Sequence, residues 1–372
     1  MGEKIPYDPA MHLNGANQAS PSIPADLSNA AWALIQSARR IALIAHEHPD
    51  GDTIGSALGL SFALLPLGKC CIVACADPTP AIYHFLPGSD TVQTDLPAED
   101  FDLVIALDAG ELSRFGSLYA RHRAFLDRAI ILNFDHHVTS HGCGIVNIID
   151  PLSAATAELV TLFLLDHSVP ISREAATCLL TGIITDTRAF EYTSTTARTL
   201  ETAAALMRAG AVPAEIVKPV YRLKPLAQVR LWALILKTMA TAADNRIIWA
   251  EMTQQMLVEA GATGEMDEGI AGYLIDIYGA EISAFFKEHT DGTIKVSLRT
   301  VEPYDSAAIA AHFGGGGHLR AAGFSLNMDL PAAKALVVPY LESVVSRRPP
   351  AADNQHSQPA SYPLVKEREA DC

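Results

Sequence analysis

Short apolar runs alternate with helical patterns over the first half of the chain. Strand-like runs recur at residues 41–46, 70–75, 102–108 and 129–134, with a weaker one at 145–149. Helical patterns occupy residues 28–40, 53–65, 154–167, 173–184 and 196–209. Near-continuous apolar strands are typical of a parallel sheet buried on both faces. The pattern therefore predicts a doubly wound α/β domain over residues 28–210.

The pattern changes after Gly210. Residues 211–243 indicate helices punctuated by proline, which suits a linker between domains. Strands are then expected at 246–251, 281–288 and 293–300, and helices at 253–260, 267–277, 305–312 and 330–346. Asp291-Gly292 predicts a hairpin turn between the last two strands. We expect a smaller mixed α/β domain at 244–346, a flexible arm at 1–27 and a disordered tail at 347–372.

Composition narrows the class of protein. The chain has 372 residues, of which 49% are hydrophobic, enough for two domains with substantial cores. It has no apolar run of about 18 residues and no secretory signal at its start, so we expect a cytoplasmic protein without a membrane partner. Its six cysteines include no C-x-x-C pair, which leaves thiolate zinc and a disulfide framework without support.

The formal net charge of −15 limits the ligands. Proteins that bind long nucleic acid do so largely by neutralising phosphates, so long duplex nucleic acid is not an expected partner. A short anionic substrate remains compatible if metal ions and a few basic residues reverse the field locally.

Acidic residues and histidines cluster where several elements end. The segment HEHPDGD follows the first predicted strand, and LDAG, NFDHH and GIITDT follow downstream. Carboxyl ends of parallel strands meet at one edge of a sheet, and carboxylates with imidazoles suit Mn²⁺, Mg²⁺, Co²⁺, Fe²⁺ or Zn²⁺. One such aspartate alone would more often cap a helix. Together they predict a dinuclear metal site formed by His46, Asp50, Asp52, Asp108, His136 and Asp186.

A glycine run in the second domain has its own chemistry. Successive backbone N–H groups without Cβ atoms can turn toward an anion, although four glycines alone more often mark a flexible turn. Nearby basic residues favour phosphate binding, and Arg299 can clamp a phosphate with its planar guanidinium. The predicted phosphate-binding residues are Arg299, Gly315, Gly316, Gly317, His318 and Arg320.

These motifs resemble those of the DHH phosphoesterase family. HEHPDGDTIGSALGL, LDAG, NFDHH and GIITDT are similar to its four motifs in order, and VSLRT and FGGGGHLRAAGF are similar to its associated domain. The resemblance covers residues 28–346. It implies two divalent ions, Mn²⁺ being the usual family choice and Mg²⁺ or Co²⁺ the alternatives.

The resemblance also implies roles for the matching residues. One ion would be held by His46 and Asp50, and the other by Asp52, His136 and Asp186, with Asp108 bridging them. A hydroxide shared by the ions would attack phosphorus. Asp135 would orient a neighbouring group, and His137 would face the scissile phosphate as a donor or general acid. The associated domain would hold the substrate's terminal phosphate and base.

Within the family, the two-domain layout most resembles the bacterial bifunctional oligoribonucleases and pAp phosphatases. This implies hydrolysis of short 5′-phosphorylated RNA to mononucleotides and conversion of pAp to AMP. A phosphodiesterase acting on linear dinucleotides such as pApA would use the same residues. Three other functions fit less well. A RecJ-like exonuclease would need a longer chain, and the second domain of a family II pyrophosphatase lacks the glycine-rich loop found here. A catalytically silent nucleotide sensor would have lost metal ligands, whereas all six positions are filled in this chain. A homodimer is compatible with the sequence.

Two positions depart from the family pattern. Ser140-His141 stands where an asparagine is common, which puts a substrate contact there in doubt. Arg188 stands where a small residue is common. This arginine either adds positive charge beside the site, favouring an extra phosphate, or pairs with Glu191.

Overall fold

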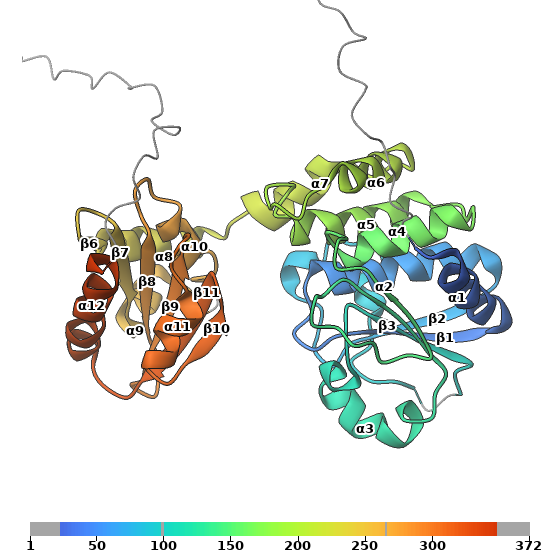
Figure 1. The fold of residues 1–372 in the computed structure, drawn as a ribbon, viewed down its shortest axis with the longest axis horizontal. Helices are drawn as coiled ribbons and strands as arrows, with labels where there is room; N and C mark the ends of the chain where they lie inside the picture. The colour runs from blue at the N-terminus through green and yellow to red at the C-terminus, as the bar shows by residue number, and fades with distance from the viewer. Residues whose placement is uncertain (1–22, 98–99, 265, 348–372) are drawn as a thin grey trace, which may run out of the picture. The chain divides into compact units, whose positions relative to one another are not determined.

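The computed structural model describes residues 23–97, 100–264 and 266–347 in two compact units, one ending at Leu223 and one starting at Lys224 (Figure 1). This boundary falls within the segment 211–243. Of the predicted arm and tail, residues 1–22 and 348–372 lie outside the described residues. Within the described ranges, no helix is long and apolar enough to cross a bilayer.

The first unit is built on a parallel sheet with the strand order β2-β1-β3-β4-β5. Its strands are β1 (Arg40–Ala45), β2 (Cys70–Ala74), β3 (Leu103–Leu107), β4 (Ile131–Asp135) and β5 (Val146–Ile149). Strands β3 and β4 are buried throughout, as expected for apolar strands covered on both faces. In this order the connections reverse direction between β1 and β3, and ligands of such sheets bind beyond the carboxyl ends of strands at that point.

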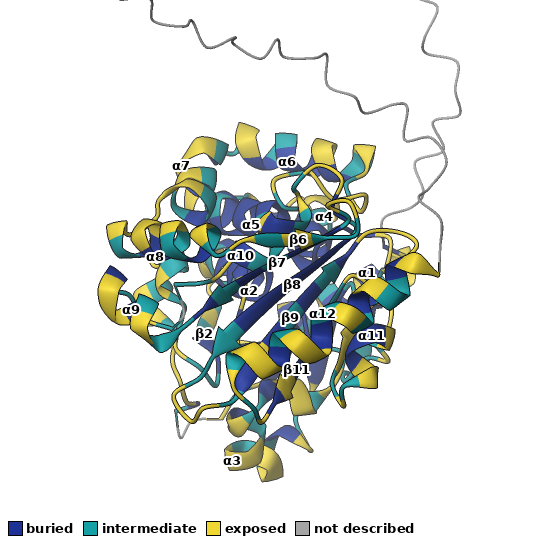
Figure 2. Cartoon of the chain, turned by 90° about the vertical axis from the view of Figure 1, so that its left-hand side faces the viewer, coloured by how far each residue is buried: buried dark blue, intermediate teal, exposed yellow. Residues whose placement is uncertain are grey.

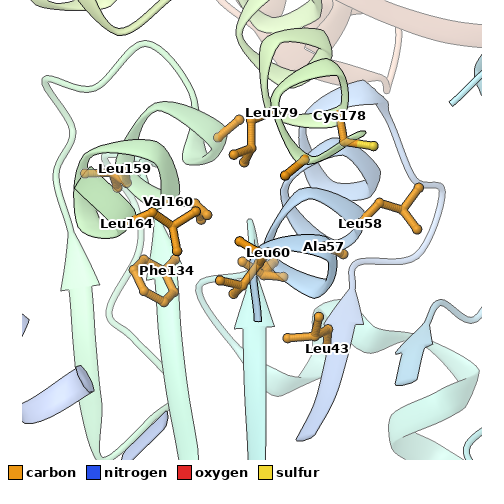
Figure 3. Close-up of a cluster of buried hydrophobic side chains, with 14 of the residues drawn as sticks. Leu43, Ala57, Leu58, Leu60, Phe134, Leu159, Val160, Leu164, Cys178 and Leu179 are labelled. Atoms are coloured by element: carbon orange, nitrogen blue, oxygen red, sulfur yellow. The ribbon is translucent and has the colours of Figure 1, made fainter. Parts of the chain in front are cut away.

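Helices cover both faces of this sheet, which confirms the doubly wound α/β prediction. The helices of this unit are α1 (Ala25–Ser37), α2 (Gly51–Leu64), α3 (Ser117–Leu126), α4 (Thr156–Asp166), α5 (Arg173–Asp186), α6 (Ala197–Arg208) and α7 (Pro213–Val217). Of these, α6 packs on α4 and α5, and α7 packs on α5. On one face, side chains of α2, α4 and α5 pack with Leu43 and Phe134 of the strands (Figure 3). On the other, Leu118 and Leu126 of α3 pack with Ile44.

Helices α2 and α5 approach so closely that glycine is needed between them. A Cβ atom on Gly182 of α5 would lie 2.5 Å from the Ala157 Cβ and 2.7 Å from the Asp52 Oδ1. Such separations are shorter than non-bonded atoms tolerate, so a side chain at 182 would displace its neighbours. This contact fixes the start of α2 against α5 and α4.

The second unit is a mixed six-stranded sheet in the order β10-β11-β9-β8-β7-β6, with only β7 and β8 parallel. Its strands are β6 (Ala240–Ala242), β7 (Ile247–Met252), β8 (Ile282–Glu288), β9 (Ile294–Thr300), β10 (Gly316–His318) and β11 (Ala321–Leu326). Figure 2 shows buried residues along β7, β8 and β9 and exposed residues on the outer faces of α11 and α12.

The helices of this unit are α8 (Leu226–Lys237), α9 (Gln254–Ala260), α10 (Ile270–Ile275), α11 (Ser306–His312) and α12 (Leu330–Ser346). A π-helical turn, Lys218–Arg222, precedes them at the end of the first unit. The predicted hairpin is present, since β8 and β9 pair antiparallel and Gly292 has a φ of 81° in the turn. Elements α3, β6, β10 and β11 were not predicted, and the helix expected at 267–277 is shorter.

Candidate metal centre

The β1–α2 turn supplies the first group of site residues. His46 directly follows β1, and Asp50 caps α2, its Oδ1 accepting hydrogen bonds from the N–H groups of Asp52 and Thr53 at 3.0 Å each. The same Asp50 oxygen lies 3.8 Å from the Nε2 of His46. Capping therefore holds this carboxylate beside the imidazole.

Asp108, directly after β3, lies between two imidazoles. Its Oδ2 is 3.3 Å from the Nε2 of His46, and its Oδ1 is 3.6 Å from the Nε2 of His136. The residue has a φ of 61°, a backbone region in which aspartate is enriched over most other side chains. Because its two oxygens face different histidines, this carboxylate has the geometry to bridge two cations.

A second group surrounds His136, which follows β4. Its Nε2 lies 3.2 Å from the Oδ2 of Asp186, the last residue of α5, and 3.9 Å from the Oδ2 of buried Asp52. Ligand atoms within 4.8 Å of one another form three sets: His46, Asp50 and Asp108; Asp52, His136 and Asp186; and Asp108, His136 and His137. The structure thus brings all six predicted metal ligands together.

The hydrogen bonds of the two histidines favour the ring tautomer that binds metal. The Nδ1 of His46 is 2.7 Å from the Glu47 carbonyl oxygen, and the Nδ1 of His136 is 3.2 Å from that of Ser153. A carbonyl oxygen can only accept, so Nδ1 carries the proton in each hydrogen bond. A neutral ring then directs its Nε2 lone pair toward the carboxylates, as metal-ligating histidines do.

Asp135 organises the turn that carries the paired histidines. Its buried Oδ1 accepts from the N–H groups of His136 and His137 at 2.8 and 3.2 Å and lies 2.8 Å from the Nδ1 of His137. The hydrogen bond to Asp135 is the main cause that raises the pKa of His137 to about 9. The imidazolium is half-exposed, so it can donate a proton to a ligand.

Several carboxylates lie close together in this centre. Their pKa shifts indicate whether cations suit this set of donors. Burial raises the pKa of Asp52 well above its usual value, and the charges of Asp108 and Asp186 raise it further. Burial likewise raises the pKa of Asp186 to about 6. Burial is the largest cause of both shifts, and repulsion from neighbouring ionised carboxylates adds to it; divalent cations would offset both. The donor set therefore fits hard or borderline metal ions.

The N-terminus of α4 also belongs to the site, a role that was not predicted from the sequence. The N–H groups of Thr156 and Ala157 donate to the two oxygens of Asp52 at 2.6 and 2.9 Å, and the Thr156 hydroxyl donates to Asp108 at 2.8 Å. A helix N-terminus stabilises negative charge, so α4 offsets part of the carboxylate repulsion. The predicted helix at 154–167, following a predicted strand, was the available signal, because such an N-terminus faces the same sheet edge.

The predicted phosphate-binding residues gather in the second unit. Arg299 of β9 pairs in register with Ala321 of β11, which pairs in turn with His318 of β10. Paired residues of antiparallel strands share a face, so Arg299 and His318 flank the small Ala321 about 10 Å apart, two strand spacings. The Nη1 of Arg320 donates to the Tyr304 carbonyl oxygen at 2.7 Å.

The glycine run differs from the predicted loop. Gly316 and Gly317 belong to the edge strand β10, while Gly315 directly precedes it. At Gly317 the φ of 145° and the 2.5 Å between an added Cβ and the Ala322 Cα exclude a side chain. Close packing on β11 is thus one reason for glycine here, and an edge strand still leaves one row of N–H groups without a strand partner.

Arg188 lies beside the centre with a φ of 49°, and Ala189 and Phe190 also have positive φ values. Non-glycine residues in this region cost about 1–2 kcal/mol each, so the turn that follows α5 is strained. The Nε of Arg188 lies 3.3 Å from the Oε2 of Glu191, the pairing that was one of its two predicted roles. The hydroxyl oxygen of Ser140 is buried beside Gly110.

Comparison with protein-family models gives two matches. The model of the DHH family N-terminal domain matches residues 40–183, and the DHHA1 domain model matches residues 247–343. The first range contains five of the six predicted metal ligands, and the sixth, Asp186, lies three residues beyond it. The second range contains the predicted phosphate-binding residues.

Comparison with individual proteins gives the same family. The bifunctional oligoribonuclease and PAP phosphatase NrnA of Thermus thermophilus is 33% identical over 312 residues, which cover 82% of this chain and 90% of that protein. The cyclic-di-AMP phosphodiesterase GdpP of Geobacillus thermodenitrificans is 26% identical over 81% of this chain, but over only 47% of its own length. The crystal structure of an exopolyphosphatase-related protein from Bacteroides fragilis superposes with a TM-score of 0.79 at 26% identity, covering 87% of this chain and 98% of that one.

Divalent metal should stabilise the protein through Asp108. At an Mn²⁺ concentration about 100 times Kd, binding to the folded state contributes about 2.7 kcal/mol, which raises the melting temperature by roughly 5–10 °C for a unit of this size. We expect this shift in chelator-treated wild-type protein and its loss in Asp108→Ala. The measurement is thermal denaturation across an Mn²⁺ titration.

Asp127→Ala is the matched control, because Asp127 is an exposed aspartate that pairs with Arg123 at 3.4 Å on the same unit. It should keep the wild-type shift. An Asp108→Ala protein that retained both the Mn²⁺ shift and hydrolytic activity would refute a bridging role for Asp108.

Proposed function

Because this chain belongs to the DHH family, we propose that it hydrolyses short 5′-phosphorylated oligoribonucleotides to mononucleotides and removes the 3′-phosphate of pAp to give AMP. The observation that carries the proposal is the placement of the two Asp108 oxygens toward different histidines, 3.3 Å from His46 and 3.6 Å from His136. Similarity to NrnA of Thermus thermophilus over 90% of that protein supports the choice of substrates.

The ligand assignment follows the geometric sets. His46 and Asp50 would hold one divalent ion, Asp52, His136 and Asp186 the other, and Asp108 would contact both. The ions, for which Mn²⁺ is our first choice and Mg²⁺ or Co²⁺ the alternatives, would activate water and screen the charge that develops on the phosphoryl oxygens. The remaining steps depend on side chains of the protein.

Hydrolysis forms a bond from a water oxygen to phosphorus and breaks the bond from phosphorus to the 3′-oxygen of the substrate. The leaving oxygen needs a proton. His137 is suited to supply it, because its hydrogen bond to Asp135 leaves Nε2 as the other ring donor and holds the ring in place. Asp135 thus acts by orienting His137 and the turn around it.

The second unit would bind the terminal phosphate of the substrate. Arg299 and His318 supply donors on one face of the sheet, and Arg320 lies two residues after His318. Gly316 and Gly317 belong to the edge strand β10, which leaves one row of N–H groups without a strand partner. The N–H of Gly315, in contrast to the prediction, donates to the Ala310 carbonyl oxygen at 3.0 Å. Short ligands also suit a chain with a net charge of −15, because only a local basic patch has to oppose the overall field.

A phosphodiesterase of linear dinucleotides such as pApA is the second candidate. Similarity to GdpP supports it, although this chain spans less than half the length of that protein. The two proposals share every catalytic residue and differ in the ligand that the second unit accepts.

Turnover of a substrate panel separates these functions. We expect Mn²⁺-dependent release of mononucleotides from 5′-phosphorylated RNAs of about two to five nucleotides, together with release of phosphate from pAp. Longer RNAs, up to about 24 nucleotides, should be poor substrates because the net charge disfavours long polyanions. Activity confined to pApA would favour the second candidate, and processive cleavage of long RNA would contradict both.

Substitution of Arg299 should impair binding of phosphorylated substrates selectively. Loss of a charge-assisted hydrogen bond of about 1.5–3 kcal/mol corresponds to a rise in KM of roughly 10–100-fold for pAp in Arg299→Ala. Turnover of a chromogenic phosphodiester without a terminal phosphate should change little. Steady-state kinetics with both substrates measure KM and turnover for each variant.

Lys295→Ala provides the control, since Lys295 is an exposed basic residue of the same strand about 13 Å away. Equal losses on both substrates in Arg299→Ala would place Arg299 outside the phosphate-binding site.

A further inference from the structure

The segment from Asp150 to Ala157 contacts three of the proposed ligands at once. The Ser153 carbonyl oxygen is 3.2 Å from the Nδ1 of His136. Further along, backbone N–H groups at 156 and 157 donate to both oxygens of Asp52, and the Thr156 hydroxyl donates to the Oδ1 of Asp108 at 2.8 Å. The direction of these three ligands therefore depends on the conformation of this segment.

A buried carboxylate holds the segment from behind. Glu158 is fully buried, and its Oε2 accepts from the N–H of Ala154 at 2.8 Å and from the hydroxyl of Thr199 at 3.1 Å. Its Oε1 accepts from the Nε of Arg198 at 3.0 Å. Together these bonds link the segment, through Glu158, to the start of α6, which contributes Thr199 and Arg198.

The guanidinium of Arg198 extends this link to the other end of the segment. Its Nη2 donates to the Oδ2 of Asp150 and to the Oγ of Ser153, both at 2.8 Å. Ser153 is thus held by Arg198 through its hydroxyl while its carbonyl accepts from His136. Arg198 is 23% exposed at the side chain, so this network is largely shielded from water.

We propose that Glu158 and Arg198 are positioning residues that fix the segment Asp150–Ala157 and thereby orient His136, Asp52 and Asp108 for binding of a divalent cation. Neither residue belongs to the sets of ligand atoms. The inference rests on the proposed function, because it takes the clustered side chains as metal ligands.

The structure gives the physical consequence of breaking the pair. Removing Arg198 would leave the buried Glu158 carboxylate without its cationic partner. It would also remove one of the two hydrogen bonds of the Ser153 hydroxyl, leaving only the bond to the Oδ2 of Asp150 at 3.0 Å. The carbonyl that orients the His136 ring would then be held less firmly, while the ligands themselves would remain. Changes behind metal ligands typically lower metal affinity about 10–100-fold. Substrate KM at saturating metal should be little affected, because neither side chain is placed to touch the substrate.

Calorimetric titration of the metal-free full-length protein with Mn²⁺ tests this directly. We expect Arg198→Met and Glu158→Gln to bind Mn²⁺ about 10–100-fold more weakly than wild type. Their turnover should recover at high Mn²⁺, with KM for pAp unchanged. Arg198→Lys should fall between, because an ammonium keeps the charge but lacks the planar fork that reaches both ends of the segment.

Arg173→Met is the matched control. Arg173 pairs with Glu215 at 3.1 Å on the same unit, but both side chains are largely exposed and neither contacts the proposed centre. This variant should bind Mn²⁺ like wild type, which separates loss of an arginine–glutamate pair in general from loss of this one.

A folded Arg198→Met protein with wild-type Mn²⁺ affinity would overturn the proposal, even if its melting temperature were lower, because the pair would then serve stability alone. If Arg198→Met does not fold, Arg198→Lys and Glu158→Gln decide by the same readout. Failure of the wild-type protein to bind Mn²⁺ would instead count against the proposed function.

Discussion

Concentrated negative charge is the constraint on which the site depends. The carboxylates of Asp52, Asp108 and Asp186 all lie within 4 Å of the Nε2 of His136, and the first two are almost fully buried. Burial of ionised carboxylates at such short separations is unfavourable unless positive charge compensates it. The N-terminus of α4 supplies part of this compensation, and divalent cations would supply the rest. The proposed chemistry follows, since the same cations would screen a phosphoryl group.

The fold brings these charges together through its strand order and one close helix contact. His46 and Asp108 follow β1 and β3, neighbouring strands between which the connections reverse, so both project at the same edge. Asp52 and Asp186 come from opposite ends of α2 and α5, and the absence of a side chain at Gly182 lets those helices approach. A strained backbone at Asp108 aims its carboxylate between the histidines.

Much of this architecture could be predicted from sequence, because its signals are local. The apolar runs predicted the parallel sheet, and contiguous motifs such as HEHPDGD identified the acidic residues at its edge. Helix α3 was missed because it is short and polar, with only Leu118 and Leu126 buried. Strand β11 was not predicted because it begins with the small residues Ala321, Ala322 and Gly323 just after the glycine run, although Ala322, Phe324 and Leu326 alternate as buried residues. Thr156, Glu158 and Arg198 belong to no recognisable sequence motif. Their contacts join residues far apart in the chain and form only in the folded protein.

The central claim is that two divalent ions share Asp108. Crystals of the full-length protein grown with Mn²⁺, with diffraction recorded at the manganese absorption edge, test it most directly. We predict two anomalous peaks, one beside His46 and Asp50 and one beside His136 and Asp186, with Asp108 contacting both. A protein that hydrolyses pAp in Mn²⁺ but shows a single peak here, or peaks elsewhere, would contradict the account.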